Sequence, residues 1–426
     1  RSEMETALLD SGAPSRPRWA SARRLETARA IFNACALVAV GVLIGSRSSS
    51  PGSPLLREEK SLEHVLAGHD KDCSSIEFTE QTLKLVNEVP VIRIFHLPDD
   101  RELATGDVLK TFEASDIARR GSHETFVVFD NARLIARFSS LLSSDQDGHQ
   151  PMLLDYPGDD GSKSEFEGLA YDSARDVFYV VRESFTHADG LMAAHVYEMQ
   201  FPAAGEAAEA VTVLSGPCNT EQAFSSANKG FEGADWLPLP GANSQDGYLF
   251  GLCEGNNCLG GKKGRLPGLG KVVLMEKRTV DGRCLWATAA TLSLPPTANF
   301  MDYSAITIRP VGDNTTDWAV AVSSQENAAV WLGRLKLGHQ RKGHVDPRKF
   351  SFTKGRVFDF PRDSECRRIY CNIEGIAWEG QDKLVAASDQ MKSGGRQDFR
   401  CWGKDQSVHT FLVPVEDMLG DVASEG

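Results

Sequence analysis

Residues 164–184 read SEFEGLAYDSARDVFYVVRES. The stretch contains a short apolar strand that opens with Phe-Glu-Gly, a polar turn, and a second apolar strand that ends in Arg-Glu-Ser. Glu167 lies near the start of the first strand, in the most apolar part of the segment. Because a buried carboxylate without a partner is costly, its position calls for a chemical reason.

The same pattern occurs five times along the chain. FEGLAY (166–171) aligns with FEGADW (231–236) and IEGIAW (373–378), and two weaker copies are ASDIAR (114–119) and YSAITI (303–308). A second and a third apolar strand follow each copy, and four copies show a fourth strand. The fifth copy reaches the C-terminal tail without one, and VPVIRIFHL (89–97), which precedes the first copy, can supply it.

Units of four antiparallel strands that repeat every 50 to 70 residues are typical of β-propeller blades. We therefore predict an all-β fold, a five-bladed β-propeller over residues 89–414. One blade shared between the two ends would close the ring by N- and C-terminal strand pairing and remove a free sheet edge. The alternatives are a non-repetitive β-sandwich and a six-bladed propeller with one degenerate blade.

The composition is that of an ordinary folded protein. Of the 426 residues, 41% are hydrophobic and 25% are charged, and the net charge is −13. The sequence has no basic stripe interleaved with aromatic residues, which argues against nucleic acid as a partner. Its acidic balance suits cations, or ligands that are carried with cations.

An uncharged run of 17 residues, AIFNACALVAVGVLIGS (30–46), follows an arginine-rich segment. Its length lies between those of a signal-peptide core and a membrane span. We predict a cytosolic basic tail (1–29), a signal anchor (30–46), a stalk and lead-in (47–88) and a C-terminal tail (415–426). The propeller would then be the lumenal (ER or Golgi) or extracellular part of a type II membrane protein. A cleaved signal peptide, which would give a secreted protein, and a buried soluble helix are the alternatives.

Cysteine usage fits an oxidising compartment. Cys35 lies in the apolar run, and the eight other cysteines follow it, so that four disulfide bonds could form in 105 ways. The sequon NTT (314–316) is in line with a glycoprotein of the secretory pathway. Two cysteine pairs are close enough in sequence to bridge locally: Cys253 with Cys258, and Cys366 with Cys371.

The first strand of a propeller blade is the innermost, so equivalent positions at its start ring the central axis. In the five copies these positions are occupied by Ser115, Glu167, Glu232, Ser304 and Glu374. Converging carboxylates repel one another unless they share protons or a cation. Calcium accepts about six to eight oxygen ligands with tolerant geometry. We therefore predict that these five residues bind calcium; the alternative is that Glu-Gly merely marks the turn before a strand.

The second strand of each copy returns to the same end of the blade and finishes in acids, amides or arginine. We expect these residues to form a second ring around the first, on a face where loops carry binding and catalytic groups. They are Asp130 with Asn131, Arg182 with Glu183, Glu254 with Asn256, Gln325 with Glu326, and Asp389 with Gln390.

The order Ser, Glu, Glu, Ser, Glu, with ASDIA and IEGIAW at its ends, resembles the calcium-activated nucleotidase (apyrase) family. That resemblance implies a lumenal or secreted five-bladed propeller with one axial calcium, which hydrolyses nucleoside di- and triphosphates. It implies that calcium binds the five residues at the strand starts, here called the marked residues: Ser115, Glu167, Glu232, Ser304 and Glu374. It also implies catalytic roles for Asp130, Arg133 and Glu183.

The chain departs from that family at two places. The family has an Asp-Asp-Arg-Thr-Gly run where this chain has DNARL (130–134), and an arginine pair where this chain has CEG (253–255). Without these arginines, we expect weaker binding of a polyphosphate group. EGLAYD and YVVRES also resemble esterase-like phytase and lactonase-type propellers.

Two functions of different class follow. The first is a calcium-dependent phosphoanhydride or phosphoester hydrolase that acts on a small anionic substrate, such as a nucleotide or a phosphate ester. The second is a non-catalytic, calcium-stabilised propeller that binds a protein or glycan partner at a membrane surface. The missing arginines favour the second, and the doubled ring of acids favours the first.

Overall fold

The computed structural model describes residues 81–90, 113–139, 152–155, 163–187, 190–203, 210–226, 229–239, 247–312, 314–338, 345–365, 367–390, 401 and 404–414. These residues form an all-β fold with three very short helices: η3 (Asn256–Cys258), α3 (Gly261–Gly264) and η4 (Pro347–Lys349). Within these ranges no helix is long and apolar enough to cross a membrane. The predicted signal anchor at 30–46 lies outside the described residues.

Three antiparallel sheets contain four strands each. One holds, in order, β2 (Ala114–Arg120), β3 (Glu124–Phe129), β4 (Leu134–Ser139) and β5 (Met152–Asp155). Another holds β14 (Ala305–Val311), β15 (Asn314–Ser324), β16 (Ala329–Lys336) and β17 (Ser351–Asp359). The third runs from β18 (Ile373–Glu379) through β19 (Lys383–Ser388) and β20 (Ser407–Leu412) to β1 (Lys84–Pro90).

The fourth sheet has eight strands and consists of two antiparallel halves. One half holds β6 (Phe166–Asp172), β7 (Val177–Thr186), β8 (Met192–Gln200) and β9 (Thr212–Ala223). The other holds β10 (Phe231–Pro238), β11 (Gly247–Cys253), β12 (Lys271–Val280) and β13 (Arg283–Ser293). The strands of the two halves pair only where β13 lies parallel to β9, over two residues of each strand.

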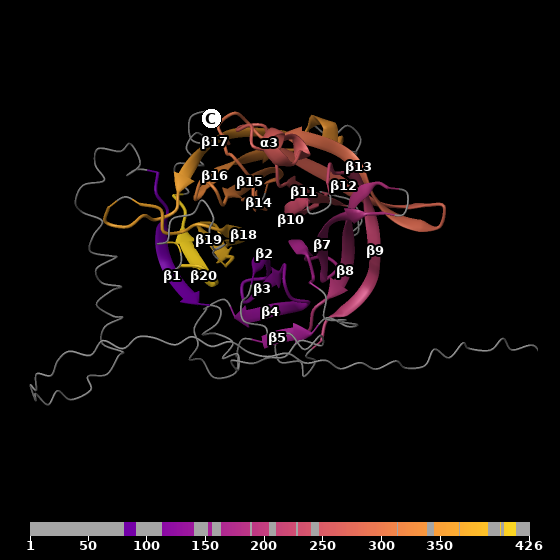
Figure 1. Ribbon diagram of the computed structural model, residues 1–426, viewed down its shortest axis with the longest axis horizontal. Coiled ribbons are helices and arrows are strands. Elements are labelled where there is room, and N and C mark those ends of the chain that lie inside the picture. Colours follow the sequence, from indigo (N-terminus) through magenta and orange to yellow (C-terminus); the bar gives the residue numbers. More distant parts are fainter. Residues whose placement is uncertain are drawn as a thin grey trace, which may run out of the picture. The chain divides into compact units, whose positions relative to one another are not determined.

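The strands β2, β6, β10, β14 and β18, here called the inner strands, surround a common centre (Figure 1). Each inner strand contacts the next one, and β18 contacts β2, so that the contacts form a closed ring. The strands farthest along each sheet, such as β5, β13 and β1, lie at the periphery (Figure 1). The described part of the chain therefore has a propeller-like all-β fold.

Apolar side chains of neighbouring sheets fill the spaces between them. Phe126 of β3 lies edge-on to Phe178 of β7, with ring centroids 4.9 Å apart, and Phe178 stacks on Phe201 at 4.0 Å. Both faces of a sheet are covered in this way, which explains why β11 and β16 are buried almost without interruption. No single sheet could bury both of its faces alone.

The N-terminal strand pairs with the C-terminal strand, as expected, but it lies earlier in the sequence than predicted. β1 spans Lys84–Pro90 rather than residues 89–97, and it pairs antiparallel with β20. Its register is set by Glu88, which accepts hydrogen bonds from Lys404 Nζ (2.6 Å) and Tyr370 Oη (3.1 Å) and contacts His409 Nδ1 (3.2 Å). The prediction chose residues 89–97 because this segment is the more apolar one. The sequence pattern does not reveal the distant partners of Glu88.

Three disulfide bonds join described cysteines. Two of them are Cys218–Cys284, which links β9 to β13, and the local Cys253–Cys258 bond, which confirms one predicted pair. The other predicted local pair is wrong, because Cys371 is bonded to Cys401. Those two residues are buried together although 30 residues separate them, which local spacing could not reveal.

The glycine of each Glu-Gly pair lies where two inner strands approach most closely. A Cβ atom added at Gly168 would lie 2.9 Å from Ala234 Cβ, and one at Gly233 would lie 2.8 Å from Ala305 Cα. At Gly375 it would lie 2.9 Å from Asp116 Cα. The repeated glycine is therefore required by the packing of the ring.

We expect Gly233→Ala to lower the free energy of unfolding by about 1–3 kcal/mol, because the new methyl group forces two backbones apart. Urea unfolding followed by fluorescence measures the effect. Thr212→Ala, at an exposed position of the peripheral strand β9, is the control and should change stability by less than about 0.5 kcal/mol. Equal stability of the two variants would contradict the close-packed ring.

Candidate functional site

The predicted metal-binding residues occupy equivalent places at the start of the inner strands. Ser115, Glu167, Glu232 and Glu374 are each the second residue of their strand, and Ser304 directly precedes β14. In β2, β6, β10 and β18 the pairing register with the second strand shifts at the marked residue. This residue therefore has no directly opposite partner in the neighbouring strand. Such β-bulges re-aim a side chain, and this geometry explains how Glu167 leaves the apolar pattern of its strand.

The structure brings the three predicted glutamate ligands into one electrostatic group. Burial, followed by the negative charges of Asp130 and Glu374, raises the pKa of Glu167 well above its usual value. Burial, followed by the charges of Glu254 and Glu167, does the same for the pKa of Glu232. The carboxyl groups thus raise one another's proton affinity, which is the situation that a bound cation relieves.

Two glutamates of the predicted outer ring join this group. One carboxylate oxygen from each of Glu183, Glu232 and Glu254 lies within 4.8 Å of the others. Lys229 Nζ binds Glu254 Oε1, while Glu254 Oε2 is buried and has no hydrogen-bond partner. We call the full group the carboxylate cluster; it consists of Glu167, Glu183, Glu232, Glu254 and Glu374.

The two serines of the predicted metal site are buried at the same strand starts. Ser304 Oγ donates to the carbonyl oxygen of Ile373 (2.7 Å) and lies 3.0 Å from Ser323 Oγ. Ser115 Oγ lies 3.5 Å from the carbonyl oxygen of Glu113. Both hydroxyl oxygens keep lone pairs, so these contacts are compatible with a role as neutral ligands.

Of the predicted catalytic residues, Glu183 and Asp130 lie at the cluster. Glu183 is buried, and burial together with the charge of Glu254 raises its pKa to about 7, against the opposing effect of Lys229. Asp130 is half-buried at the end of β3, and Lys163 Nζ lies 3.5 Å from its Oδ2. Arg133 is half-buried in the turn between β3 and β4.

Sequence reasoning missed several charged groups that border the cluster. Lys229 binds Glu254, and Glu165, whose φ of 53° is in the left-handed region, binds Arg182. Burial raises the pKa of Asp302 to about 6; its carboxylate accepts the backbone N–H of Glu326 at 3.1 Å. The sequence does contain a signal for some of these groups. The residue two positions before the marked residue is an acid or an amide in four of the five copies: Glu113, Glu165, Asp302 and Asn372.

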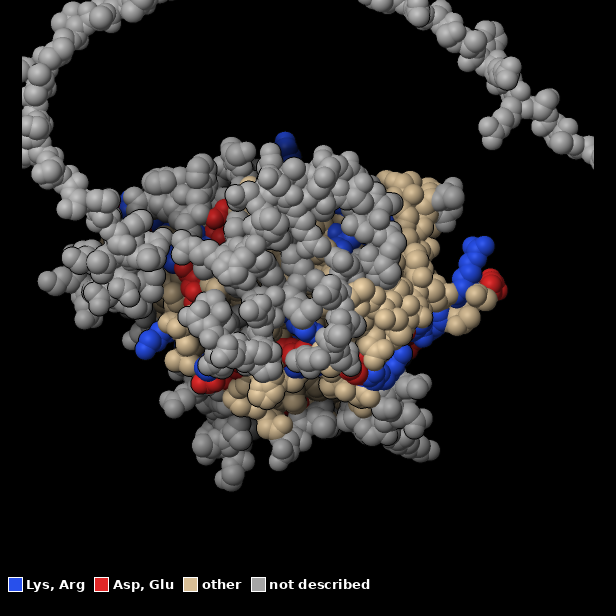
Figure 2. Space-filling model, turned by 90° about the horizontal axis from the view of Figure 1, so that it is seen from below, with Lys and Arg blue, Asp and Glu red and all other residues tan. Residues whose placement is uncertain are grey.

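Charges of both signs mix on the described surface seen in Figure 2. Lys and Arg side chains lie beside Asp and Glu there rather than in a patch of one sign. The carboxylate cluster differs from this face, because it gathers five side chains of one sign from β6, β7, β10, β18 and the end of β11.

No protein-family model and no curated protein matches the chain. Among solved structures, the chain is similar to the PQQ-bound aldose sugar dehydrogenase of Streptomyces coelicolor, with 13% identity over 72% of this chain and 97% of the other, at a TM-score of 0.36. It is similar to an exo-1,5-α-L-arabinanase from a bovine ruminal metagenomic library, with 11% identity over 71% and 92% of the two chains, at a TM-score of 0.35.

Similarity to virginiamycin B lyase of Staphylococcus aureus is 9% identity over 78% of this chain and 99% of the other, at a TM-score of 0.30. Scores this low carry no argument about activity. The resemblance to calcium-activated nucleotidases finds no support in these comparisons. The site must therefore be interpreted from its own chemistry.

The raised pKa of Glu183 makes the stability of the metal-free protein depend on pH. Because the pKa rises from its usual 4.5 to about 7 on folding, the folded state binds more protons in this window, and stability falls as pH increases through it. Calcium bound at the cluster, as the sequence predicts, would offset this loss of stability. We expect calcium to raise the melting temperature more at about pH 8 than at about pH 5 in calorimetry. An equal rise at both values would contradict this coupling.

Glu167→Gln removes one of the repelling charges. We expect this variant to melt at a higher temperature than the wild type without metal at about pH 8, and to lose most of its response to calcium. Glu198→Gln is the matched control, because Glu198 is also buried but pairs with Lys277 at 2.9 Å. The control should melt at a lower temperature and keep the response to calcium. A metal-free Glu167→Gln protein less stable than the wild type would refute the repulsion.

Proposed function

We propose that the chain is a five-bladed β-propeller that binds calcium at its axis and hydrolyses a phosphoanhydride or phosphoester. The blade count treats the eight-stranded sheet as two blades, because the strand pairing between its halves is limited to two residues of β13 and two of β9. The sheet that contains both β1 and β20 is then the blade shared by the two ends of the propeller.

The convergence of the carboxylate cluster carries this proposal. Oxygen donors of this kind are those that calcium prefers, and its tolerant geometry accepts a site built from several strand starts. Glu167, Glu232 and Glu374 would provide the charge, with Ser115 and Ser304 as neutral donors. The buried Oε2 of Glu254, which lacks a hydrogen-bond partner, fits a site completed by a cation.

Calcium at this site would supply a positive charge that binds and polarises a phosphate group. Glu183 is the carboxylate that we assign to proton transfer. Its pKa is about 7 without metal, and calcium bound beside it would lower this pKa, which favours the ionised form that acts as a general base. Asp130, whose charge acts on Glu183, would orient the attacking water with it.

Cations at the border of the cluster would balance the charge of the substrate. Arg133 in the turn after β3 is the arginine that the nucleotidase resemblance suggests. Lys229 binds Glu254 in the third-blade segment where this chain lacks the family's arginine pair. Its ammonium group binds Glu254 and also acts on Glu183, so an incoming phosphate would compete with these carboxylates for it.

The proposed compartment is the secretory lumen or the cell exterior. Three disulfide bonds among the described residues support an oxidising environment. Attachment through a type II anchor at 30–46, secretion after cleavage, and glycosylation at Asn314 are parts of this proposal that rest on the sequence.

A non-catalytic, calcium-stabilised propeller with a protein or glycan partner is the second candidate. The observation that favours it is the engagement of nearby cations: Lys163 lies against Asp130, Lys229 binds Glu254, and Arg182 binds Glu165. Phosphate binding would have to displace these ion pairs. A purely structural calcium site would leave them intact.

Phosphate release from nucleoside di- and triphosphates and from p-nitrophenyl phosphate, with calcium and then with excess EGTA, tests the function. We expect release that requires calcium. Glu183→Gln should lower kcat by about 100-fold or more while calcium still raises the melting temperature. Glu198→Gln, the buried control away from the cluster, should keep its activity.

Two results would contradict the proposal of a calcium-dependent hydrolase. Turnover that persists in EGTA would exclude a role for calcium in the reaction. Absence of turnover, together with a calcium-dependent rise in melting temperature, would leave the non-catalytic propeller as the function of the same site.

A further inference from the structure

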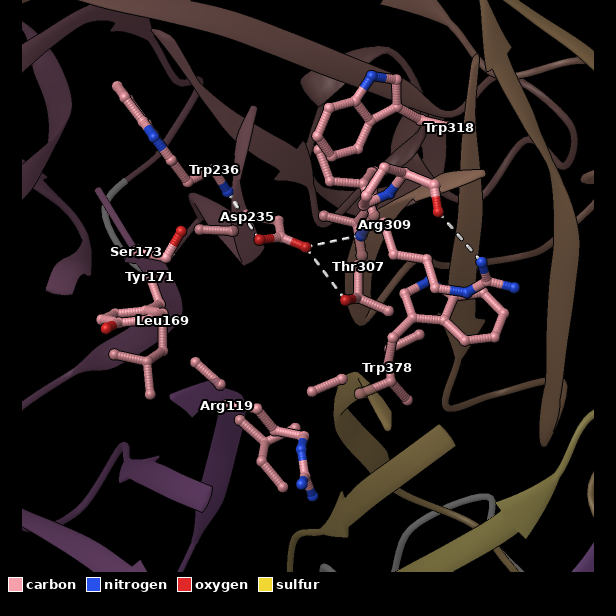
Figure 3. A pocket seen from close by; sticks show the side chains of 18 of the residues that line it. Arg119, Leu169, Tyr171, Ser173, Asp235, Trp236, Thr307, Arg309, Trp318 and Trp378 are labelled. Carbon is pink, nitrogen blue, oxygen red and sulfur yellow. Dashed lines mark hydrogen bonds between the residues drawn. The ribbon is translucent and has the colours of Figure 1, made fainter. Parts of the chain in front are cut away.

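A second site lies at the other end of the inner strands. Whereas the carboxylate cluster is at the strand starts, a pocket of about 380 Å³ is lined by residues two to five positions further along each inner strand, including Arg119, Tyr171, Trp236, Arg309 and Trp378. This volume suits a small molecule. Figure 3 shows Arg309, Trp318 and Trp378 on one side of the pocket, and Leu169 and Tyr171 on the opposite side.

Asp116 closes the pocket toward the cluster. Its fully buried carboxylate accepts the backbone N–H groups of Ile117 (2.8 Å), Leu169 (2.8 Å) and Ala234 (3.2 Å), all three of which line the pocket. Asp116 thereby ties together three inner strands just below the pocket. The pocket is therefore separate from the carboxylate cluster.

Aromatic and aliphatic side chains give the pocket apolar walls. Three tryptophans contribute, at positions 236, 318 and 378, and each is less than one-tenth exposed. Aliphatic residues such as Ile117, Leu169 and Ile306 also line it, together with polar residues such as Ser173 and Thr307. Such walls favour a ligand with a flat apolar body.

Arg309 places a buried positive charge in the wall of this pocket, beside the tryptophans. The residue is 6% exposed, and its guanidinium donates to neutral oxygens, Gln381 Oε1 (2.7 Å), Gln381 O (2.6 Å) and Pro310 O (3.2 Å). It lies over the ring of Trp378 at 4.6 Å, and no carboxylate of the described chain forms an ion pair with it. Burial lowers the pKa of Arg309, and the charge of Asp382, which forms no ion pair with it, offsets this effect only in part.

Two hydrogen-bond donors beside this charge lack acceptors. Arg309 Nε and Trp378 Nε1 are both buried and have no hydrogen-bond partner in the structure. Buried donors of native proteins almost always find acceptors. A ligand that enters here should therefore supply oxygen acceptors, and the cation favours acceptors that carry negative charge.

The other charged groups of the pocket are already satisfied. Asp235 accepts the N–H of Trp236 (2.7 Å), the N–H of Ile308 (2.6 Å) and the hydroxyl of Thr307 (3.1 Å), as Figure 3 shows. Arg119 forms an ion pair with Glu379 at 3.3 Å. Arg309 is thus the pocket cation that is left to bind an anion.

We propose that this pocket binds a small organic carboxylate with a planar apolar body. The carboxylate accepts hydrogen bonds from Arg309 and Trp378, and the apolar body lies among the tryptophan rings. The proposal concerns a site other than the carboxylate cluster and does not depend on the function proposed there.

Tryptophan fluorescence of the full chain tests this proposal, because three tryptophans line the pocket. Benzoate and phenylacetate are titrated as anionic probes, and benzyl alcohol and benzamide as neutral probes of similar shape. Saturable quenching by a carboxylate, with at least tenfold weaker binding of its neutral counterpart, is expected. Equal binding of neutral and anionic probes, or no saturable binding of either carboxylate, would overturn the proposal. This comparison needs no variant.

Arg309→Gln should weaken binding of the carboxylate by about tenfold or more while leaving binding of the neutral probe unchanged. Arg137→Gln is the matched control, because Arg137 is also buried and donates to the backbone oxygens of Pro202 and Ala203, both at 2.9 Å, outside the pocket. Its affinity should equal that of the wild type. An Arg309→Gln protein that melts cooperatively and binds the carboxylate as tightly as the wild type would also overturn the proposal.

Discussion

The close approach of neighbouring inner strands is the constraint on which the rest of the structure depends. At Gly168, Gly233 and Gly375, a Cβ atom would lie within 3 Å of the adjacent strand, so only glycine lets the strands meet. This contact draws the strand starts together at one end and the strand ends together at the other. Both candidate sites are consequences of that convergence, because residues far apart in the sequence become neighbours around the centre.

Convergence has opposite electrostatic consequences at the two ends. At the strand starts, β-bulges direct glutamates toward one another, and burial with mutual repulsion raises the pKa values of Glu167 and Glu232. At the strand ends, Arg309 is a buried cation among tryptophans and has only neutral oxygens as partners. In our proposals, a cation would relieve the repulsion at one end, and an anion would bind the buried charge at the other. Asp116 lies between them and joins three inner strands through backbone N–H groups.

Much of the fold could be predicted from the repeated phrase alone. The recurrence of the phrase placed the inner strands of all five copies, and the incomplete last copy indicated that an N-terminal strand would pair with the C-terminal one. Its exact position was missed, because Glu88 selects the register through Lys404, Tyr370 and His409, which lie about 300 residues away. The Cys371–Cys401 bond was missed for the same reason, since local spacing carries no information on distant contacts.

For the sites, the sequence by itself determined which residue types recur at the strand starts, and it therefore pointed to Glu167, Glu232 and Glu374 as a group. Only the tertiary structure decided that Glu183 and Glu254 join them, that Lys229 borders them, and that a pocket with Arg309 forms at the opposite end. The physical reason is that a repeat fixes the side-chain type and its place on a strand. Burial, bulge geometry and the pairing of charges depend on how five strands meet in space.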